Sequence, residues 1–547
     1  MQIEEQTGDP TKPPFPGPAG LATAFIKRIP LPVLLCTAVF AVFFPVLGND
    51  FVNWDDAQYV LSNPALRGSW LDALVFSPGY YHPLTTLTYK LEFVLFGLNP
   101  APYHFTSLAL HLAACVSAFY LLTALGARRN AAFLGALLFG IHPVHVEPVA
   151  WVSGRKELLW GIFSAWTLIS YLGFVDTKLK RYFFYSLAFF LLAVLSKPFA
   201  IVLPFVLLLA DYYRGRAFTF RLLLEKSPYL AIAAPLLTLS TAPSGFLLAN
   251  GERTISFLNA VAFIGQNAVF YAGKFLLPVG LSALYPSLVL SMNPVIHFLL
   301  LLSGILAAFL LAKAQRPGAA GPGAVKKIFF GLGFSLITVF PALIVSPPAD
   351  RYFYLPALGL CFLYVVFVSR LHGALSGDRP AGPASFYGRL LILAVTVHFL
   401  VLGLASARRV PVWRNSLTMW NDVLRKYPKE HVAYYGRGNT YAAAGDYDAA
   451  IRDLTRCLEL DPRYWKAFNN RGRIFTEKKE FDRAIADYTA AITANPGEAS
   501  LLLNRGNVYF TKGDMARAIA DYDQALAIAP GFIPALENKK RASGTGR

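Results

Sequence analysis

Long apolar runs separated by short basic stretches fill the chain up to about Arg409, and they constrain its fold more than any other feature. A helix needs about 20 mainly apolar residues to cross a bilayer, whose hydrocarbon core offers backbone polar groups no partner. Charged residues make up 15% of the 547 residues, against about 25% in an ordinary soluble chain. The sequence therefore predicts an all-α polytopic membrane protein.

The chain contains about eleven such runs. They cover residues 29–47, 104–125, 131–149, 157–175, 182–196, 198–213, 228–247, 294–313, 328–346, 353–369 and 390–407. A further apolar stretch, 257–278, carries Gln266, Asn267 and Lys274. We interpret this stretch as interfacial or re-entrant, and a full crossing stays open as the alternative.

The basic residues of this part gather in short loops, which predicts how the chain is oriented. These loops are 128–129, 178–181, 214–226, 313–327 and 370–389. Loops rich in Lys and Arg face the cytosol, so residues 1–28 form a cytosolic tail and the C-terminus lies on the other side. This placement accounts for the formal net charge of +18, so we do not expect nucleic-acid binding. We expect a bacterial inner membrane with a periplasmic C-terminal domain, or, in a eukaryote, an ER membrane with a luminal one.

From Trp413 onward the chain reads as a soluble helical domain with an internal repeat. Arg-Gly pairs recur every 34 residues at Arg437, Arg471 and Arg505, and three prolines keep the same spacing. A 34-residue period of this kind is the tetratricopeptide (TPR) signature, and it builds a helical solenoid. Full repeats are expected at 431–464, 465–498 and 499–532, after a partial repeat at 413–430. The transmembrane domain then covers 29–412 and the TPR domain 413–547.

The first helices of a TPR array line a groove that binds peptide segments. Asn439, Arg473 and Asn507 share one repeat position that faces this groove, and Asn469 and Glu477 flank it. We expect a peptide or protein partner there. The alternative is that these five residues form an ordinary solvated surface.

Two adjacent acids, Asp55 and Asp56, follow the first span in a long outer loop, 48–103. A carboxylate beside apolar surface can have a raised pKa, and it can act as a general base or bind a divalent cation. The alternative is a polar cap at the membrane interface. No cofactor and no protein-bound metal are predicted.

Other polar residues of the outer face are candidates for binding a phosphate and a sugar. Arg351 precedes a late span, and its guanidinium could hold a phosphate through two hydrogen bonds. Lys274 could serve the same phosphate, and so could Arg155 and Lys156 of the second outer loop. The remaining candidates for the substrate cavity are His82, His142, His145 and Glu147. The two histidines at 142 and 145 fit no zinc-site spacing, because Pro143 breaks the helical arrangement.

In this order and topology, the motifs resemble the transmembrane and TPR repeat-containing family of the GT-C membrane glycosyltransferases. The matching segments are Phe51–Asp56, Tyr81–Leu84, His142–Glu147, Ser153–Leu158, Ser196–Lys197, Asp350–Pro356 and the terminal repeats. The resemblance implies a GT-C-type helical bundle. Only three full repeats are present, where relatives often carry more.

The resemblance also implies an inverting glycosyltransferase whose donor is a polyprenyl-phosphate-linked sugar, mannose in eukaryotic relatives. The implied acceptor is a Ser or Thr hydroxyl of a polypeptide, and transfer takes place on the non-cytosolic face. Asp55 matches the essential acid of the family's first outer loop, with Asp56 as the less favoured partner. Arg351 sits where a phosphate-binding residue would be useful. The alternative function is a non-catalytic scaffold for envelope proteins, which Asp55 and Arg351 far apart would favour.

Overall fold

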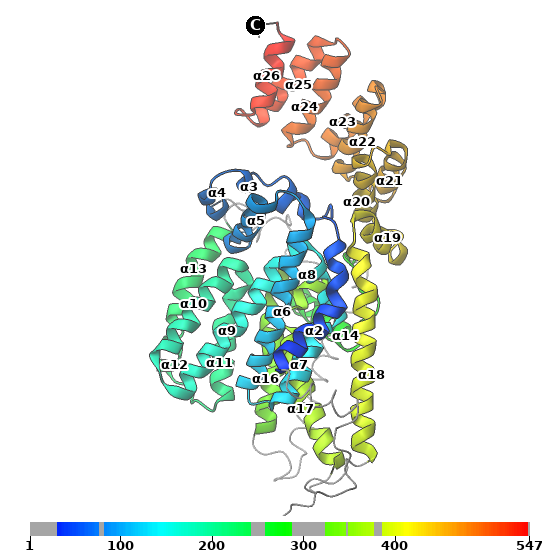
Figure 1. Ribbon diagram of the computed structural model, residues 1–547. Helices are drawn as coiled ribbons and strands as arrows, with labels where there is room; N and C mark the ends of the chain where they lie inside the picture. Colours follow the sequence, from blue (N-terminus) through cyan, green and yellow to red (C-terminus); the bar gives the residue numbers. More distant parts are fainter. Residues whose placement is uncertain are drawn as a thin grey trace, which may run out of the picture.

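A computed structural model describes residues 30–75, 81–241, 257–286, 323–345, 348–376 and 386–544. These residues form helices and connecting loops, with no strand among them, as the all-α prediction requires. Figure 1 shows a bundle of mostly upright helices with the helical repeats stacked on one end. The expected span at 294–313 lies outside the described residues.

Six helical segments of the described residues are long and apolar enough to cross a membrane. They contain α2 (Leu31–Phe43) with η1 (Phe44–Gly48), α6 (Pro100–Ala124), α9 (Arg155–Thr177), α16 (Gly323–Val345), α17 (Ala357–Ser376) and α18 (Phe386–Arg409). The expected spans at 182–196, 198–213 and 228–247 correspond to shorter helices. These are α10 (Lys180–Ser196), η5 (Pro198–Val202) with α11 (Leu203–Tyr213), and α13 (Ser227–Thr241). The total number of crossings stays a prediction.

The expected span at 131–149 is not one straight helix. It consists of α7 (Arg129–Ile141), the turn η3 (Pro143–His145) and α8 (Val146–Ala150), with a bend of 52°. Pro143 causes the break, because it has no backbone N–H to continue the helix. At the bend, His142 Nδ1 accepts a hydrogen bond from Val144 N, 3.3 Å away. The turn η4 (Val152–Gly154) then leads into α9.

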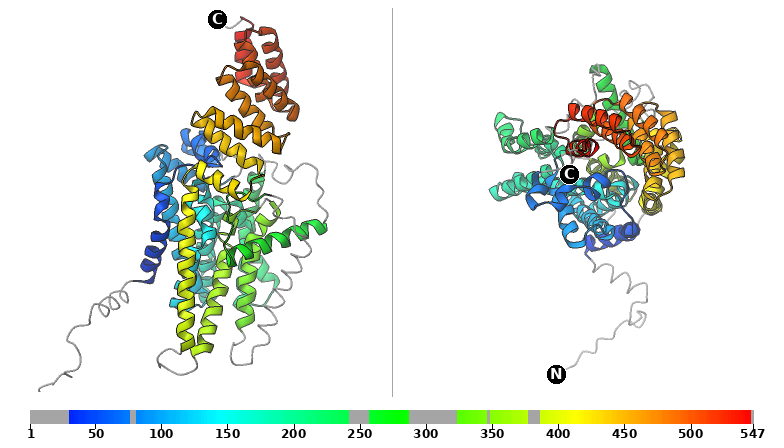
Figure 2. Two further views of the ribbon diagram at one scale, coloured as in Figure 1. Left: turned by 90° about the vertical axis from the view of Figure 1, so that its right-hand side faces the viewer. Right: turned by 90° about the horizontal axis from the view of Figure 1, so that it is seen from above.

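Helix α14 (Phe257–Leu276) is the stretch interpreted as interfacial or re-entrant. It is not among the six candidate spans. Figure 2 shows it in bright green, lying across the direction of the upright helices. The crosswise course favours the non-crossing interpretation.

The loop between α2 and α6 lies at the end of the bundle that carries the repeats (Figure 1). It contains a short π-helical turn, η2 (Ala57–Leu61), and the helices α3 (Pro64–Arg67), α4 (Trp70–Val75) and α5 (Pro83–Phe96). Lys90 Nζ donates to the carbonyls of Leu66 and Gly68, at 2.7 and 2.6 Å, and so closes the loop on itself.

The C-terminal domain consists of paired antiparallel helices. They are α19 (Ser416–Lys426), α20 (His431–Ala443), α21 (Tyr447–Leu460), α22 (Trp465–Glu477), α23 (Phe481–Ala494), α24 (Ala499–Thr511), α25 (Met515–Ile528) and α26 (Ile533–Ala542). The arginine of each Arg-Gly pair bridges to an aspartate in the second helix of its unit; Arg471 and Asp487, for example, are 2.7 Å apart. This recurring pair explains why both residue types follow the period.

A short turn and several polar contacts join the repeats to the bundle. The turn η8 (Val410–Trp413) connects α18 directly to α19, whose first residues are capped by Asn415. Asp422 of α19 lies 3.7 Å from Arg409 at the end of α18. Lys426 donates to the Leu281 carbonyl at 2.5 Å. The joint therefore ties α19 both to a span and to the segment after α14.

Candidate active site

Asp55 lies at the boundary between the bundle and the repeats, because the preceding residues are tied to the repeat domain. Asp50 N donates to the Arg414 carbonyl at 2.8 Å. Trp54 packs edge-on against Trp420 of α19, with ring centroids 5.0 Å apart. Asp55 itself is half-buried, so part of the residue is accessible to a substrate.

Asp56 is fully buried and connects two loops. Its carboxylate accepts hydrogen bonds from Val52 N at 3.0 Å, from Ser153 N at 2.9 Å and from the Ser153 hydroxyl. Burial raises the pKa of Asp56 to about 6, although these donors lower it. Both carboxylate oxygens of Asp56 are already bonded within the protein. We therefore assign Asp56 the role of positioning Asp55.

Arg351 belongs to the turn η7 (Asp350–Phe353), just before α17. Its Nη1 pairs with Glu147 at 2.6 Å, and its guanidinium lies over the rings of Trp151 and Tyr352, at 5.1 and 4.8 Å. Nη2 and Nε make no hydrogen bond to any described residue. Glu147 thus holds the guanidinium in place and leaves donors available.

Lys156, at the start of α9, is a second cation of this site. Its Nζ lies 4.6 Å from the centre of the Tyr59 ring and 5.8 Å from that of Trp151. It forms no ion pair or hydrogen bond with the described part of the chain. Two cations, Lys156 and Arg351, therefore lie near the ring of Trp151.

The charge of Asp55 acts on this group of residues. It interacts electrostatically with Tyr59, Lys156 and Arg351. Burial opposes the charge on Arg351, but Tyr352, Glu147 and Asp55 raise the pKa of the guanidinium well above its ordinary value. We call Asp55, Tyr59, Lys156, Arg351 and Tyr352 the outer cluster. The charge of the acid after the first span therefore acts on the guanidinium before a late one.

Lys197 contacts the outer cluster through Tyr352, with its Nζ 5.0 Å from the centre of that ring. Its ammonium is bonded to both carboxylate oxygens of Glu157, at 2.6 and 2.7 Å. Burial lowers the pKa of Lys197 to about 8, although Glu157 opposes this effect. Because Glu157 already neutralises Lys197, the available cations of the cluster are Lys156 and Arg351.

Arg155 does not join the outer cluster, although it precedes Lys156 in the chain. It is fully buried, and its Nη1 pairs with Glu92 of α5 at 2.5 Å. Nη2 donates to the Tyr103 carbonyl at 2.8 Å, and the guanidinium lies 4.6 Å from the ring of Tyr89. A phosphate would have to displace Glu92, so the geometry gives Arg155 a structural role in place of the expected substrate-binding one.

Lys274 also lies apart from Arg351. Its ammonium donates to the Val279 carbonyl at 2.7 Å and to that of Gly280 at 3.3 Å. Its charged neighbours are Asp350 and Arg409, which lie 3.3 Å apart. Asp350 and Arg351 thus face different groups, and Lys274 belongs with the group that joins the bundle to α19. The geometry does not support the expected phosphate contact.

The histidines expected in the cavity pack against protein groups. His142 Nε2 lies 2.9 Å from the Phe275 carbonyl, and its ring stacks on that of Phe275 at 4.7 Å, which ties α7 to α14. His145 Nδ1 contacts the Phe139 carbonyl at 2.5 Å. His82 is buried, with its ring 5.0 Å from that of Tyr59. Of the three, only His82 contacts a member of the outer cluster.

The groove residues of the repeats form a ladder of amides. The Oδ1 atoms of the three expected asparagines each accept a hydrogen bond from the Nδ2 of an asparagine on the next unit. The pairs are Asn439 with Asn470 at 2.8 Å, Asn469 with Asn504 at 2.9 Å, and Asn507 with Asn538 at 2.8 Å. Arg473 and Glu477 are exposed beside them. Because each amide keeps further donors and acceptors, the ladder suits an extended peptide.

Comparison with known proteins bears on both parts of the chain. A family model described as tetratricopeptide repeat matches residues 413–463, 435–499 and 477–531. A protein O-mannosyl-transferase of Caenorhabditis elegans is 24% identical over 478 residues, which cover 79% of this chain and 63% of that protein. The resemblance expected from the motifs is confirmed. The chain is an integral membrane protein with C-terminal TPR units.

Two further similarities cover shorter regions. Human protein O-mannosyl-transferase TMTC3 is 32% identical over 165 residues, 28% of this chain and 17% of that protein. The solved structure of MamA is 28% identical and covers 24% of this chain and 77% of its own, with a TM-score of 0.23. The chain therefore spans less than two thirds of the length of the two protein O-mannosyl-transferases.

Proposed function

We propose that the protein is a membrane glycosyltransferase. It transfers a sugar, mannose by analogy with its relatives' names, from a polyprenyl-phosphate-linked donor to a Ser or Thr hydroxyl of a polypeptide. The reaction takes place on the non-cytosolic face. The observation that carries the proposal is the outer cluster, in which one half-buried acid meets two cations with unused donors.

The proposed step is a single inverting displacement. The acceptor hydroxyl attacks C1 of the sugar from the face opposite the phosphate, and Asp55 takes the hydroxyl proton. A new C1–O bond to the acceptor forms as the C1–O bond to the phosphate breaks. The electron pair of the broken bond leaves with the polyprenyl phosphate. This leaving group is a weak base, so it needs neutralisation of its charge more than it needs a proton.

Lys156 and Arg351 supply that neutralisation in the proposed site. The free Nη2 and Nε of Arg351 can donate two hydrogen bonds to phosphate oxygens, while Glu147 fixes the other end of the guanidinium at 2.6 Å. Lys156 takes the place for which Lys274 was expected, since its ammonium contacts only aromatic rings among the described residues. Cations fixed in advance stabilise charge that develops in the transition state.

The repeat domain would present the acceptor polypeptide. The amide ladder joins the first helices of successive units, and residues 50–54 connect the first repeat helices to Asp55 by direct contacts. An acceptor segment held along the ladder would therefore be kept on the same side of the membrane as the proposed base.

The decisive experiment measures sugar transfer by the purified full-length protein from polyprenyl-phospho-mannose to a Ser/Thr-rich peptide. Asp55→Asn should lower turnover by at least about 100-fold, the typical contribution of a general base. Asp50→Asn is the matched control, because Asp50 is an exposed acid of the same loop; it should leave turnover within about twofold of wild type. Undiminished transfer by a folded Asp55→Asn variant would remove Asp55 from the mechanism.

A further inference from the structure

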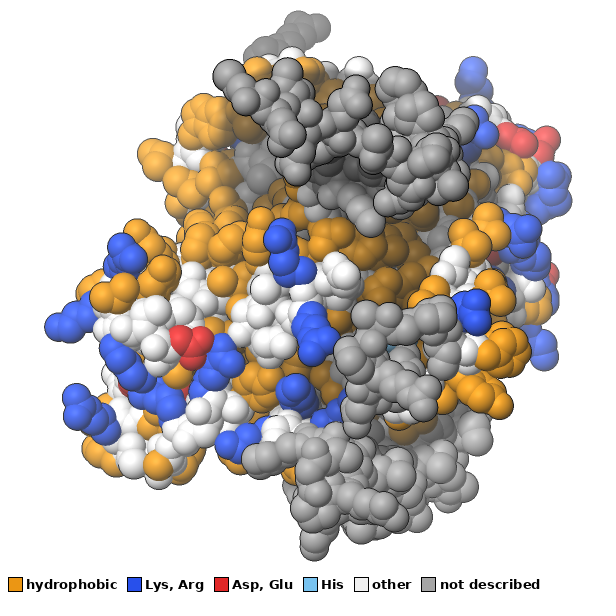
Figure 3. Space-filling model, turned by 60° about the horizontal axis from the view of Figure 1, so that its bottom comes forward, with side chains coloured by type: hydrophobic (Ala, Val, Ile, Leu, Met, Phe, Trp, Pro, Cys, Tyr) orange, Lys and Arg blue, Asp and Glu red, His pale blue; other side chains and the backbone are white. Residues whose placement is uncertain are grey.

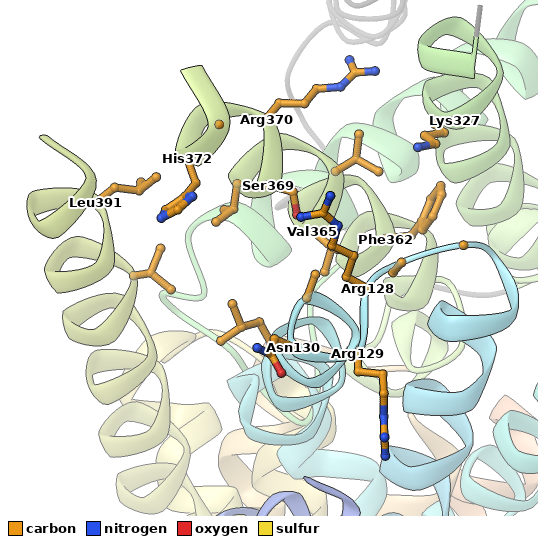
Figure 4. Close-up of a pocket in the computed structure, with 18 of the residues that line it drawn as sticks. Arg128, Arg129, Asn130, Lys327, Phe362, Val365, Ser369, Arg370, His372 and Leu391 are labelled. Atoms are coloured by element: carbon orange, nitrogen blue, oxygen red, sulfur yellow. The ribbon is translucent and has the colours of Figure 1, made fainter. Parts of the chain in front are cut away.

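A cavity of about 990 Å³ opens at the end of the bundle opposite the repeats. Its walls come from the turn between α6 and α7, the first turns of α16, and facing parts of α17 and α18. Figure 4 shows Asn130 of the turn below the hollow, His372 of α17 and Leu391 of α18 to its left, and the Arg128 side chain extending toward Ser369 of α17. The outer cluster lies at the other end of the spans, so this cavity is separate from the proposed active site.

The lining of the cavity is divided by chemistry. Four cationic side chains belong to it, those of Arg128, Arg129, Lys327 and Arg370, and none of the lining residues described is acidic. Toward the bundle the lining becomes apolar, with residues such as Leu134, Phe362 and Val365. Figure 3 brings this end of the molecule forward and shows Lys and Arg side chains spread over it. An amphiphile with an anionic head and apolar tails has this same division.

The start of α7 adds to the positive field. Arg128 is the N-cap residue of this 13-residue helix, and no side chain caps the first amides. Arg128, Arg129, Asn130 and Ala131 all line the cavity. Unsatisfied N–H groups and the positive end of the helix dipole favour an anion at such a position.

Membrane orientation explains the charge of these loops, but it does not require a cavity that continues into apolar surface. A free phosphate ion would occupy only the basic mouth, and an uncharged lipid would leave Arg128, Arg129 and Lys327 without a counter-charge among the described residues. Described residues of three loops predicted to be cytosolic, 128–129, 313–327 and 370–389, line the cavity, and the cytosolic leaflet is rich in anionic lipids. The volume lies at the upper end of the range for ligand pockets.

We propose that this cavity is a binding site for an anionic phospholipid of the cytosolic leaflet. The phosphate head group lies between the α6–α7 turn and Lys327 of α16, and the upper parts of the acyl chains lie against the apolar residues of α7, α17 and α18. The proposal does not depend on the glycosyltransferase activity, because its observations all come from the other end of the molecule.

The test is native mass spectrometry of the purified full-length protein, supplied with phosphatidylglycerol or phosphatidylcholine. Wild type should retain phosphatidylglycerol in preference to phosphatidylcholine. The double variant Arg128→Gln/Lys327→Gln should lower this preference about 30-fold, because two basic contacts are lost. The matched control is Lys180→Gln/Arg181→Gln, which removes two exposed basic side chains at the same predicted face, outside the cavity; it should behave as wild type.

Three results would overturn the proposal. The first is equal retention of the two lipids by wild type. The second is an equal loss of phosphatidylglycerol in the double variant and in the control, which would reduce the effect to net charge. The third is displacement of the lipid by millimolar inorganic phosphate alone, which would show a simple anion site. Thermal unfolding of both variants at the wild-type temperature excludes misfolding as the cause of any loss.

Discussion

Asp55 and Asp56 are adjacent in the chain but lie in different environments. Asp56 has its carboxylate bonded to Val52 and Ser153 and is closed to solvent. Asp55 is half-buried, and its charge acts on the cations of the outer cluster. The buried acid connects the segment after the first span to η4, so the half-buried acid beside it is held at one position. Of these two identical side chains, Asp56 therefore has a supporting role, and Asp55 is the one to which we assign chemistry in the proposed function.

This division predicts a pH effect on stability. The pKa of Asp56 is raised by burial from 3.8 to about 6, so the folded protein binds one more proton than the unfolded chain between these values. Its contribution to the free energy of unfolding is therefore largest below about pH 4 and falls as the pH rises to about 6, by up to about 3 kcal/mol. The melting temperature of wild type minus that of Asp56→Asn should fall across this window and stay constant above pH 7. A difference that is flat from pH 4 to 6 would contradict the prediction.

At the same scale, part of the candidate site follows from the sequence. Asp55 and Arg351 were predictable, because each is a charged residue next to an apolar run. The choice between Arg155 and Lys156 was not, because neighbours at the start of a helix point in different directions. The packing of α5 determines which of the two is available, because Glu92 of α5 forms an ion pair with Arg155 at 2.5 Å. The expected phosphate contact of Lys274 could not be checked from the sequence either. It depends on the course of α14, which places Lys274 near Asp350.

Residues 50–54 are the element that connects the repeat domain to the candidate site. Asn53 makes four hydrogen bonds there: its N donates to Ser416 Oγ at 2.9 Å, and its Nδ2 donates to the Gly436 carbonyl at 2.9 Å and to Thr440 Oγ1 at 2.8 Å. Its Oδ1 accepts from Trp420 Nε1 at 2.7 Å. Because Asp55 follows two residues later, the first repeat helices determine where the proposed base lies.

We therefore expect Asn53→Ala to loosen this connection. Each of the three side-chain hydrogen bonds that it removes contributes about 1 kcal/mol. Hydrogen exchange of α19 and of residues 50–56 should become faster, and turnover in the transfer assay should fall about tenfold with the KM for the donor unchanged. Asn99→Ala is the control, because Asn99 caps α6 without touching the repeats. Exchange rates equal to those of wild type would show that Asn53 does not hold the joint.

The regular elements were the most predictable. The 34-residue period places both helices of each repeat, because every unit reuses the same Arg–Asp pair and the same proline. The bend between α7 and α8 departs from the expected single span, although Pro143 was visible as its cause. The helices α3 to α5 could not be predicted in detail, because contacts such as Lys90 with the Leu66 carbonyl depend on the folded loop.

At the scale of the whole molecule, a single contact restricts the membrane topology. Asp50 N donates to the Arg414 carbonyl at 2.8 Å, so the end of the first span and the end of the last one lie on the same side. The chain between them must cross the membrane an even number of times. The expected spans satisfy this condition only if 257–278 does not cross, which agrees with the crosswise course of α14 (Figure 2).

Together with the cytosolic placement of the basic loops, this argument predicts that Gln58 and the repeats face the outside, while Arg129 faces the cytosol. In intact cells, a membrane-impermeant thiol reagent should label Gln58→Cys, and it should label Arg129→Cys only after permeabilisation. The four natural cysteines set the background, and three of them are buried. A reporter fused after Arg547 should score as non-cytosolic. If Gln58→Cys and the reporter fell on opposite sides, the contact between residues 50 and 414 could not exist, and the repeats could not reach the outer cluster.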